Sequence, residues 1–295
     1  MRVSRDNGVC VQHGDTQIHL DASRIVRDGV TCISHAHADH VRNHYSDLIL
    51  TPYTSALYPF KRARHKTMPY GVSFDYDGMW VSLHNANHIL GSSQFMIEDG
   101  STMVYTGDFR LKESLLGRCE PLECDTLVIE ATFGLPEYVF PEPADVYDSI
   151  ASWTKTSLAS GRNVLFGAYA LGKSQEIIRV LNQEGITPVV HPKIADFARV
   201  YNENGFHLKF VSSLTPEGGA MLSDQFAAIM PTSLMDGRFA HALKFASVLE
   251  YVEWAKSDAR PGDIPASPSN VYKNKGWQGW YNWLGKQKKN KGKPS

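Results

Sequence analysis

Residues 33–40 carry the densest group of metal-binding side chains in the sequence. The stretch is Ile-Ser-His-Ala-His-Ala-Asp-His, so three imidazoles, those of His35, His37 and His40, and the carboxylate of Asp39 fall within six positions after a short apolar run. Imidazole and carboxylate are ligands that Zn²⁺ accepts, and a catalytic zinc keeps one position for water. The spacing therefore predicts a metal site just beyond the end of a strand.

Two further segments offer one ligand each. His88 and Asp108 both follow a strand-like apolar run and lie near a glycine, Gly91 and Gly107 respectively. A glycine lets the backbone turn tightly at such a point. We therefore expect three separated loops to converge on one metal centre. A lone histidine is more often only solvated or hydrogen bonded, and we interpret these in that way: His13, His19, His44, His65, His84 and His207.

The cysteines do not indicate a competing site. Cys10, Cys32, Cys119 and Cys124 contain no Cys-x-x-Cys pair, the spacing typical of zinc ribbons and redox motifs. We expect all four to be reduced and partly buried, with neither a thiolate zinc site nor a disulfide framework.

The pattern resembles the metallo-β-lactamase superfamily. Asp21 in Leu-Asp-Ala is similar to the family's first motif, residues 35–40 to the second, His88 to the third and Asp108 to the fourth. In the family the aspartate of the first motif orients the metal-binding loop through hydrogen bonds to the ligands. The resemblance implies this ligand set: His35, His37 and His88 on one ion, Asp39 and His40 on a second, and Asp108 between them.

Downstream segments resemble the β-CASP branch, the subset of that superfamily that cuts nucleic acid. Residues 127–134, Leu-Val-Ile-Glu-Ala-Thr-Phe-Gly, are similar to its acidic motif, residues 169–176 to its helix start and residues 188–192 to its histidine motif. The similarity covers about residues 8–235 and is greatest to DNA-ligase-associated exonucleases, with the mRNA 3′-end processing enzymes as more distant members. It implies these catalytic residues: Asp39, Asp108, Glu130 and His191.

Glu130 and His191 would, by this resemblance, orient a water molecule or protonate the leaving group. Gly167 to Ser174 also satisfies the spacing of a phosphate-binding loop, but no nearby strand offers the aspartate that an ATP site needs. We expect instead that Lys173 and Ser174, at the start of a helix, contact a phosphate of the substrate.

The resemblance to the nuclease branch ends near residue 235. The family's final histidine motifs are missing, and His241 lacks the acidic neighbours of such a motif, so we interpret it as a surface histidine. The tryptophan-rich residues 260–285 instead resemble a phage-integrase-like repeat of viral and algal proteins. Without the C-terminal histidine the second site is expected to be weaker, so the expected cofactor is one or two Zn²⁺, with Mn²⁺ as an alternative.

The fold class expected is α/β, an αββα metallo-β-lactamase sandwich. Before residue 135 short apolar runs alternate with turn residues, as in an antiparallel sheet, and residues 40–45 are predicted to begin a helix. Beyond residue 144 strands alternate with helices, as in a small parallel α/β unit. Four segments follow: a metallo-β-lactamase domain over 1–135, a shortened β-CASP α/β segment over 136–235, a small helical module over 236–285 and a basic disordered tail over 286–295.

Composition excludes some classes of protein. With 295 residues and 42% hydrophobic content the chain can bury a large core, and a net charge of −1 argues against a protein that is basic all over. No stretch is apolar enough to span a bilayer, and residues 1–6 lack the apolar run of a secretory signal. We expect an intracellular protein with no membrane partner.

The function predicted is metal-assisted hydrolysis of phosphodiester bonds. A DNA exonuclease of repair or replication is favoured, with a DNA ligase or another repair or replication protein as partner. Three alternatives remain open: an RNA-processing β-CASP nuclease, a nucleic-acid-binding pseudo-nuclease and a hydrolase of small substrates. The retention of every ligand of the first four motifs disfavours the second, and the helical insertion after Glu130, which favours a long groove over a small pocket, disfavours the third.

Overall fold

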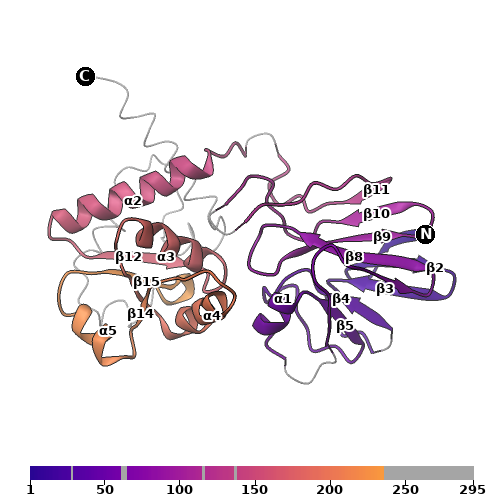
Figure 1. The fold of residues 1–295 in the computed structure, drawn as a ribbon, viewed down its shortest axis with the longest axis horizontal. Coiled ribbons are helices and arrows are strands. Elements are labelled where there is room, and N and C mark those ends of the chain that lie inside the picture. The colour runs from indigo at the N-terminus through magenta and orange to yellow at the C-terminus, as the bar shows by residue number, and fades with distance from the viewer. Residues whose placement is uncertain (28, 61–64, 115–116, 136–137, 236–295) are drawn as a thin grey trace. The chain divides into compact units, whose positions relative to one another are not determined.

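The computed structural model describes residues 1–235 apart from 28, 61–64, 115–116 and 136–137. Backbone contacts divide the chain into two compact units, Met1–Thr132 and Phe133–Ser295 (Figure 1). The sequence placed a boundary slightly later, after residue 135. The module and tail predicted beyond residue 235 lie outside the described residues.

The first unit contains a six-stranded sheet with the strands in chain order. Its strands are β1 (Arg2–Arg5), β2 (Val9–His13), β3 (Thr16–Leu20), β4 (Val30–Cys32), β5 (Asp47–Leu50) and β6 (His65–Thr67). The first three pair antiparallel, whereas β3 to β6 pair in parallel. Helix α1 (Pro52–Leu57) connects the last two strands and begins at Thr51, whose side chain accepts a hydrogen bond from Thr54 N.

A second sheet of five strands packs on the first through the core of this unit. Its strands are β7 (Ser73–Tyr76), β8 (Met79–Asn85), β9 (Ser93–Glu98), β10 (Thr102–Tyr105) and β11 (Thr126–Val128). Fully buried Ile18 and Leu20 of the first sheet share one apolar cluster with Leu83, Phe95 and Ile97 of the second. Alternate residues of a strand point to the same face, so each sheet contributes one apolar face to this cluster.

The antiparallel sheet expected for this region is only partly correct. Strands β3 to β6 are parallel, and so are β10 and β11. Parallel neighbours need a crossover of about a dozen residues or more, because the chain must return to the same end of the sheet. Residues 33–46, between β4 and β5, form such a crossover, and it contains the histidine-rich motif.

The helix predicted over residues 40–45 is wrong. The chain makes a turn that ends at His40 and then runs without helix to β5. Tertiary contacts replace the helical hydrogen bonds: His40 Nδ1 lies 2.8 Å from Asp21 Oδ2, Arg42 donates to carbonyl oxygens, and His44 Nδ1 accepts from Val26 N. Side chains that bond so many partners outside the segment hold it in an extended path.

The second unit is a parallel α/β structure, as predicted from the alternating pattern. Four strands pair in parallel in the order β12 (Val164–Ala168), β15 (Ala227–Pro231), β13 (Val189–Val190) and β14 (Val211–Ser212). The helices are α2 (Pro143–Ala159), α3 (Lys173–Gln183), α4 (Pro192–Glu203) and the short α5 (Pro216–Met221), followed by a 3-10 turn at Thr232–Leu234. Together with the first unit this is the mixed α/β architecture expected.

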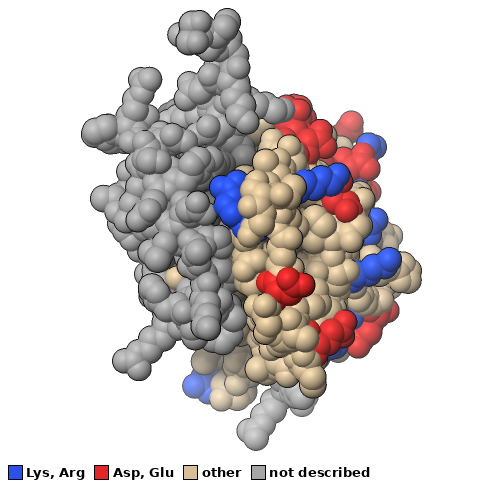
Figure 2. Space-filling view, turned by 90° about the vertical axis from the view of Figure 1, so that its left-hand side faces the viewer, with Lys and Arg blue, Asp and Glu red and all other residues tan. Residues whose placement is uncertain are grey.

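Two features of the described residues bear on membranes and on charged partners: the length of the helices and the distribution of surface charge. None of the described helices is long and apolar enough to cross a bilayer. In Figure 2 the basic and acidic side chains of the described part are interspersed. The described residues on this face therefore form no purely basic patch to which a polyanion would bind.

Candidate metal centre

The ligand-type residues follow three strands of the first unit. His35 and His37 come after β4, His88 after β8 and Asp108 after β10. Strands β8 and β10 both pair antiparallel with β9, so they run in the same direction and end at the same edge of their sheet. The three loops converge there, as the sequence predicted.

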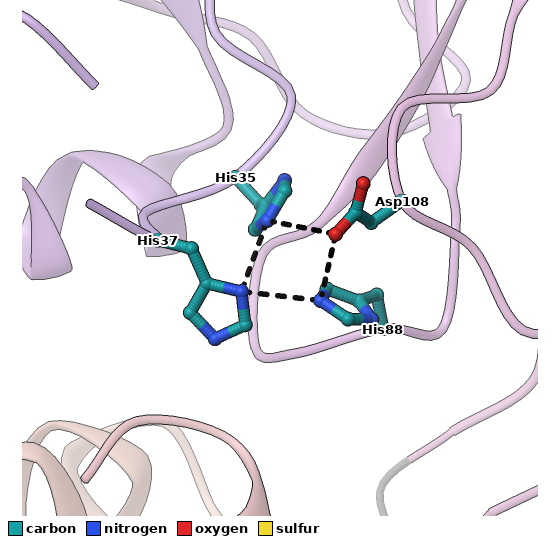
Figure 3. A group of neighbouring side chains, drawn as sticks. All are labelled: His35, His37, His88 and Asp108. Atoms are coloured by element: carbon teal, nitrogen blue, oxygen red, sulfur yellow. Dashed lines mark hydrogen bonds and ion pairs between the residues drawn. The ribbon is translucent and has the colours of Figure 1, made fainter. Parts of the chain in front are cut away.

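Three imidazole nitrogens and one carboxylate oxygen lie within 4.8 Å of one another (Figure 3). His37 Nδ1 lies 3.1 Å from both His35 Nε2 and His88 Nε2. Asp108 Oδ2 lies 3.4 Å from His88 Nε2 and 3.7 Å from His35 Nε2. Figure 3 shows all four side chains directed toward one another. We call these four residues the first ligand group.

Four of the six separations between ligand atoms of the first ligand group lie near the value for a tetrahedral zinc ion, and all six are within 4.8 Å. A tetrahedral Zn²⁺ with Zn–N distances of about 2.0–2.1 Å separates its ligand atoms by about 3.3–3.4 Å. The four contacts above range from 3.1 to 3.7 Å and enclose that value. Imidazole and carboxylate together suit zinc and are also compatible with manganese. The residues therefore fit a divalent cation.

The other oxygen of Asp108 faces a second set of ligand-type atoms. Asp108 Oδ1 lies 3.5 Å from His40 Nε2, and His40 Nε2 lies 3.8 Å from Asp39 Oδ2. Asp39 is largely exposed, with a side-chain exposure of 81%. We call His40, Asp39 and Asp108 the second ligand group. Asp108 thus belongs to both groups, with one oxygen directed to each.

The carboxylate of Asp21 accepts hydrogen bonds from residues next to both ligand groups. Its Oδ1 accepts from Ser34 N, and its Oδ2 accepts from Ser34 Oγ, from Tyr105 Oη and from His40 Nδ1. The residue is buried and adopts a positive φ of 47°, an uncommon conformation for a residue with a side chain. Asp21 also lies close to His35 and His40, but its oxygens are already occupied by these donors.

Burial and neighbouring charges shift three ionisable groups of the centre. Burial lowers the pKa of His35 well below its usual range, and the neighbouring imidazoles lower it further. Burial alone would also lower the pKa of His40, but the hydrogen bond and charge of Asp21, with Asp108 and Asp39, raise it to about 9. Burial raises the pKa of Asp108 to about 6; His40 opposes this, and the Glu130, Asp39 and Asp21 carboxylates add to it.

Two glycines allow the loops to approach closely, as their sequence positions suggested. Gly91 has φ 82°, and a Cβ atom there would lie 2.5 Å from the Thr54 nitrogen. Gly107 has φ 54°, and a Cβ atom there would lie 2.7 Å from the Ser34 Cβ. Both separations are far shorter than a van der Waals contact, so only glycine fits without displacement.

Several residues that hold the loops were not identified from the sequence. Asn87 donates from Nδ2 to the carbonyl oxygens of Arg110 and Lys112 and so joins the His88 loop to the Asp108 loop. Ser92 Oγ accepts from His88 N. The sequence signal was weak, because a polar residue next to a ligand is common in any loop.

The remaining predicted residues divide between the two units. Glu130 lies just beyond β11 in the first unit, accepts from Thr132 N at its Oε2 and is near enough to raise the pKa of Asp108. His191 precedes α4 in the second unit, and its Nδ1 accepts from Lys193 N. Lys173 Nζ lies 4.9 Å from the centre of the Tyr169 ring, and the buried Ser174 hydroxyl donates to Tyr169 O.

The cysteines are as predicted. Cys10, Cys32 and Cys119 are buried, Cys124 is partly exposed, and all four are free thiols. Burial raises the pKa of Cys32 far above its usual range, so this thiol stays protonated.

Parts of this sequence are similar to known proteins. No family model matches the sequence. The chain is 36% identical over 182 residues to a protein of Opitutus terrae named "Probable DNA ligase", which corresponds to 59% of this chain and 18% of that protein. It is 28% identical over 177 residues to "Transcription termination factor FttA" of Methanocaldococcus jannaschii, 56% of this chain and 27% of that protein.

Shorter matches have names that refer to RNA. The chain is 33% identical over 117 residues to "RNase aCSPSF2" of Saccharolobus solfataricus, 38% of this chain and 23% of that protein. It is 30% identical over 125 residues to "Endoribonuclease YSH1" of Candida albicans, 41% of this chain and 14% of that protein. The chain therefore spans only about a fifth of the length of such relatives. Their names point to the β-CASP metallo-β-lactamase nucleases.

A solved structure shares the fold. A protein of unknown function from Enterococcus faecalis V583 superimposes with a TM-score of 0.51 at 16% identity, covering 69% of this chain and 58% of that one. At this identity the likeness concerns the fold alone. The predicted resemblance of the C-terminal segment to a viral or algal repeat finds no support among these relatives.

Proposed function

We propose that this protein is a metal-dependent hydrolase that cleaves phosphodiester bonds of nucleic acid. The observation that carries the proposal is the double role of Asp108, one oxygen of which belongs to a three-histidine group while the other faces His40. A carboxylate between two ligand groups is suited to two neighbouring cations. The names of the relatives supply the substrate class, since several of them refer to RNA or DNA processing.

Zn²⁺ is the cofactor we propose, in one or two copies, with Mn²⁺ as the alternative. His35, His37, His88 and Asp108 would hold the tighter ion, and His40, Asp39 and Asp108 the weaker one, because Asp39 is largely exposed. Bound cations of this kind polarise phosphoryl oxygens and lower the pKa of water.

The protein's own groups would bind the phosphodiester and handle protons. Asp108 would hold the ions, and Glu130, whose charge reaches Asp108, would orient an attacking water or accept its proton. We assign His191 the donation of a proton to the leaving oxygen on the basis of its motif. Asp39 would complete the metal site and help to orient the water.

Lys173 is proposed as a contact for a substrate phosphate. Its ammonium lies over the Tyr169 ring at the start of α3, where the helix dipole favours an anion. The hydroxyl and the backbone N–H of Ser174 both donate to Tyr169 O, so Ser174 would support the turn that presents Lys173 to the phosphate.

DNA is proposed as the substrate in preference to RNA, with exonuclease action in repair or replication. The match to the protein named "Probable DNA ligase" extends over 182 residues, against 125 for "Endoribonuclease YSH1". We propose that the protein acts inside the cell and that its partner is a DNA ligase or another repair or replication protein. An RNA-processing nuclease is the second candidate, favoured by the RNA-related names of other relatives.

Two other candidate functions predict different results in a nucleic-acid cleavage assay. A pseudo-nuclease would bind nucleic acid without cleaving it, and the assembled ligand groups disfavour it. A hydrolase of small substrates would act on lactams or thioesters and ignore nucleic acid. The parallel α/β unit that follows Glu130 disfavours this class, because an added domain is suited to a long substrate.

The deciding experiment is a cleavage assay on matched substrates. The purified chain is incubated with 5′-phosphorylated single-stranded DNA and with RNA of the same sequence, with and without added zinc or manganese. Asp108→Asn should abolish cleavage, whereas Asp15→Ala, which removes an exposed carboxylate from the turn between β2 and β3, should not. Metal-independent cleavage, or none on either polymer with metal bound, would contradict the proposal.

A further inference from the structure

The hydroxyl of Ser34 lies between Asp21 and His35. Ser34 Oγ donates to Asp21 Oδ2 and is 2.9 Å from His35 Nδ1. A serine hydroxyl has one proton to give but two lone pairs. Because that proton is directed to the carboxylate, the contact with His35 requires Ser34 Oγ to accept and His35 Nδ1 to donate.

This direction of donation decides which nitrogen of His35 is free. With the proton on Nδ1, the lone pair is on Nε2, the atom directed to the first ligand group and 3.1 Å from His37 Nδ1. The other tautomer would put an N–H bond on Nε2, directed to the position of the metal, and would remove the proton that the contact with Ser34 Oγ requires. His35 is fully buried, so water is not available to compensate an unpaired Nδ1.

We propose that Ser34 is a positioning residue that holds His35 in the tautomer able to bind a metal through Nε2. The inference rests on the metal site of the proposed function and adds to it a determinant of the tighter site. A hydrogen-bond acceptor on the far nitrogen commonly fixes the tautomer of a metal-binding histidine.

The effect should be confined to one ligand group. His40 Nδ1 bonds Asp21 Oδ2 directly at 2.8 Å, without Ser34 between them. One carboxylate therefore serves two histidines, His40 directly and His35 through a hydroxyl. Loss of the hydroxyl should weaken the ion held by His35, His37 and His88 and leave the Asp21–His40 bond in place.

The chain offers a matched control for this hydroxyl. Ser93 is also fully buried, and its hydroxyl donates to the Ser34 carbonyl at 3.2 Å, but this bond does not reach the imidazole of His35. Ser93→Ala and Ser34→Ala thus remove the same group from adjacent buried positions. Circular dichroism would establish that both variants fold.

The test combines the tautomer with the metal affinity in the full chain. Two-bond ¹⁵N–¹H NMR correlations of the metal-free protein should show the His35 proton on Nδ1 in wild type and Ser93→Ala, and on Nε2 in Ser34→Ala. Zinc titration by calorimetry should show a Kd for the first ion about 10- to 100-fold weaker in Ser34→Ala. Ser93→Ala should bind zinc as the wild type does.

Two results would overturn the inference. The first is that His35 of the wild-type protein carries its proton on Nε2. The spectrum of the wild type alone decides this point. The other is a folded Ser34→Ala that keeps the wild-type tautomer and zinc affinity. If the wild type binds neither zinc nor manganese, the proposed function fails, and the NMR result still decides the role of Ser34.

Discussion

Replacing Gly107 by alanine should damage both the stability and the metal site. The added Cβ would lie 2.7 Å from Ser34 Cβ and 2.8 Å from Ser34 Oγ, at a residue with φ 54°. An L-residue in this left-handed region costs about 1–2 kcal/mol. Overpacking of a tight buried contact adds a further ~1–3 kcal/mol. We therefore expect Gly107→Ala to lower the free energy of unfolding by about 2–5 kcal/mol.

Gly14 separates the two contributions. It has a similar φ of 57°, yet a Cβ atom there would meet nothing within 4 Å. Gly14→Ala should therefore show only the backbone cost, about 1–2 kcal/mol. Urea denaturation of both variants and the wild type measures the difference. Gly107→Ala should in addition weaken zinc binding, because the clash displaces the hydroxyl that contacts His35.

Equal losses of stability in the two variants would refute this reasoning. Such a result would mean that the Ser34 loop moves aside freely, and that Gly107 is required only for its backbone conformation. Zinc affinity gives a second, independent check. A Gly107→Ala protein that is destabilised but binds zinc normally would show that the Ser34 contact does not control the site.

Four further predictions concern the metal, catalysis, the thiols and the C-terminal segment. His37→Ala should remove at least one ion per chain, measured by elemental analysis, with circular dichroism unchanged; full metal content would disprove its role as a ligand. Alanine at Glu130 or at His191 should each slow cleavage by on the order of 10²-fold with metal retained, and near wild-type turnover in both would contradict their proton-transfer roles. A thiol reagent should label Cys124 in the folded protein and the other cysteines only after denaturation, since those are buried; rapid labelling of all four would contradict the burial. His241→Ala should leave metal stoichiometry unchanged, and loss of a second ion would identify it as the missing C-terminal ligand.

Local sequence was sufficient for the identity of the ligands and for part of the fold. His35, His37, Asp39 and His40 are so close in the chain that all four must lie in one loop beyond β4. The change from two-residue to helical periodicity near residue 144 likewise predicted the parallel α/β unit, because periodicity depends on which face of each element is buried.

Strand direction and hydrogen-bond partners needed the tertiary structure. A short apolar run such as residues 48–50 is typical of a buried strand but does not give the direction of its neighbours, so the parallel pairing of β3 to β6 needed the tertiary structure. The sequence of residues 40–45 favoured a helix, but contacts to Asp21 and Val26 outweighed that preference. Local propensity is a weak determinant when distant partners are available.

The arrangement of the metal centre itself was decided by contacts between distant residues. Asp21 receives a hydrogen bond from Ser34, 13 positions away, and another from Tyr105, 84 positions away. Which oxygen of Asp108 faces which histidine, and which nitrogen of His35 carries the proton, depend on such bonds. The sequence alone determined which groups could bind a metal, whereas their orientation required the packing of two sheets, because a hydrogen bond depends on distances and angles between atoms that the chain brings together only on folding.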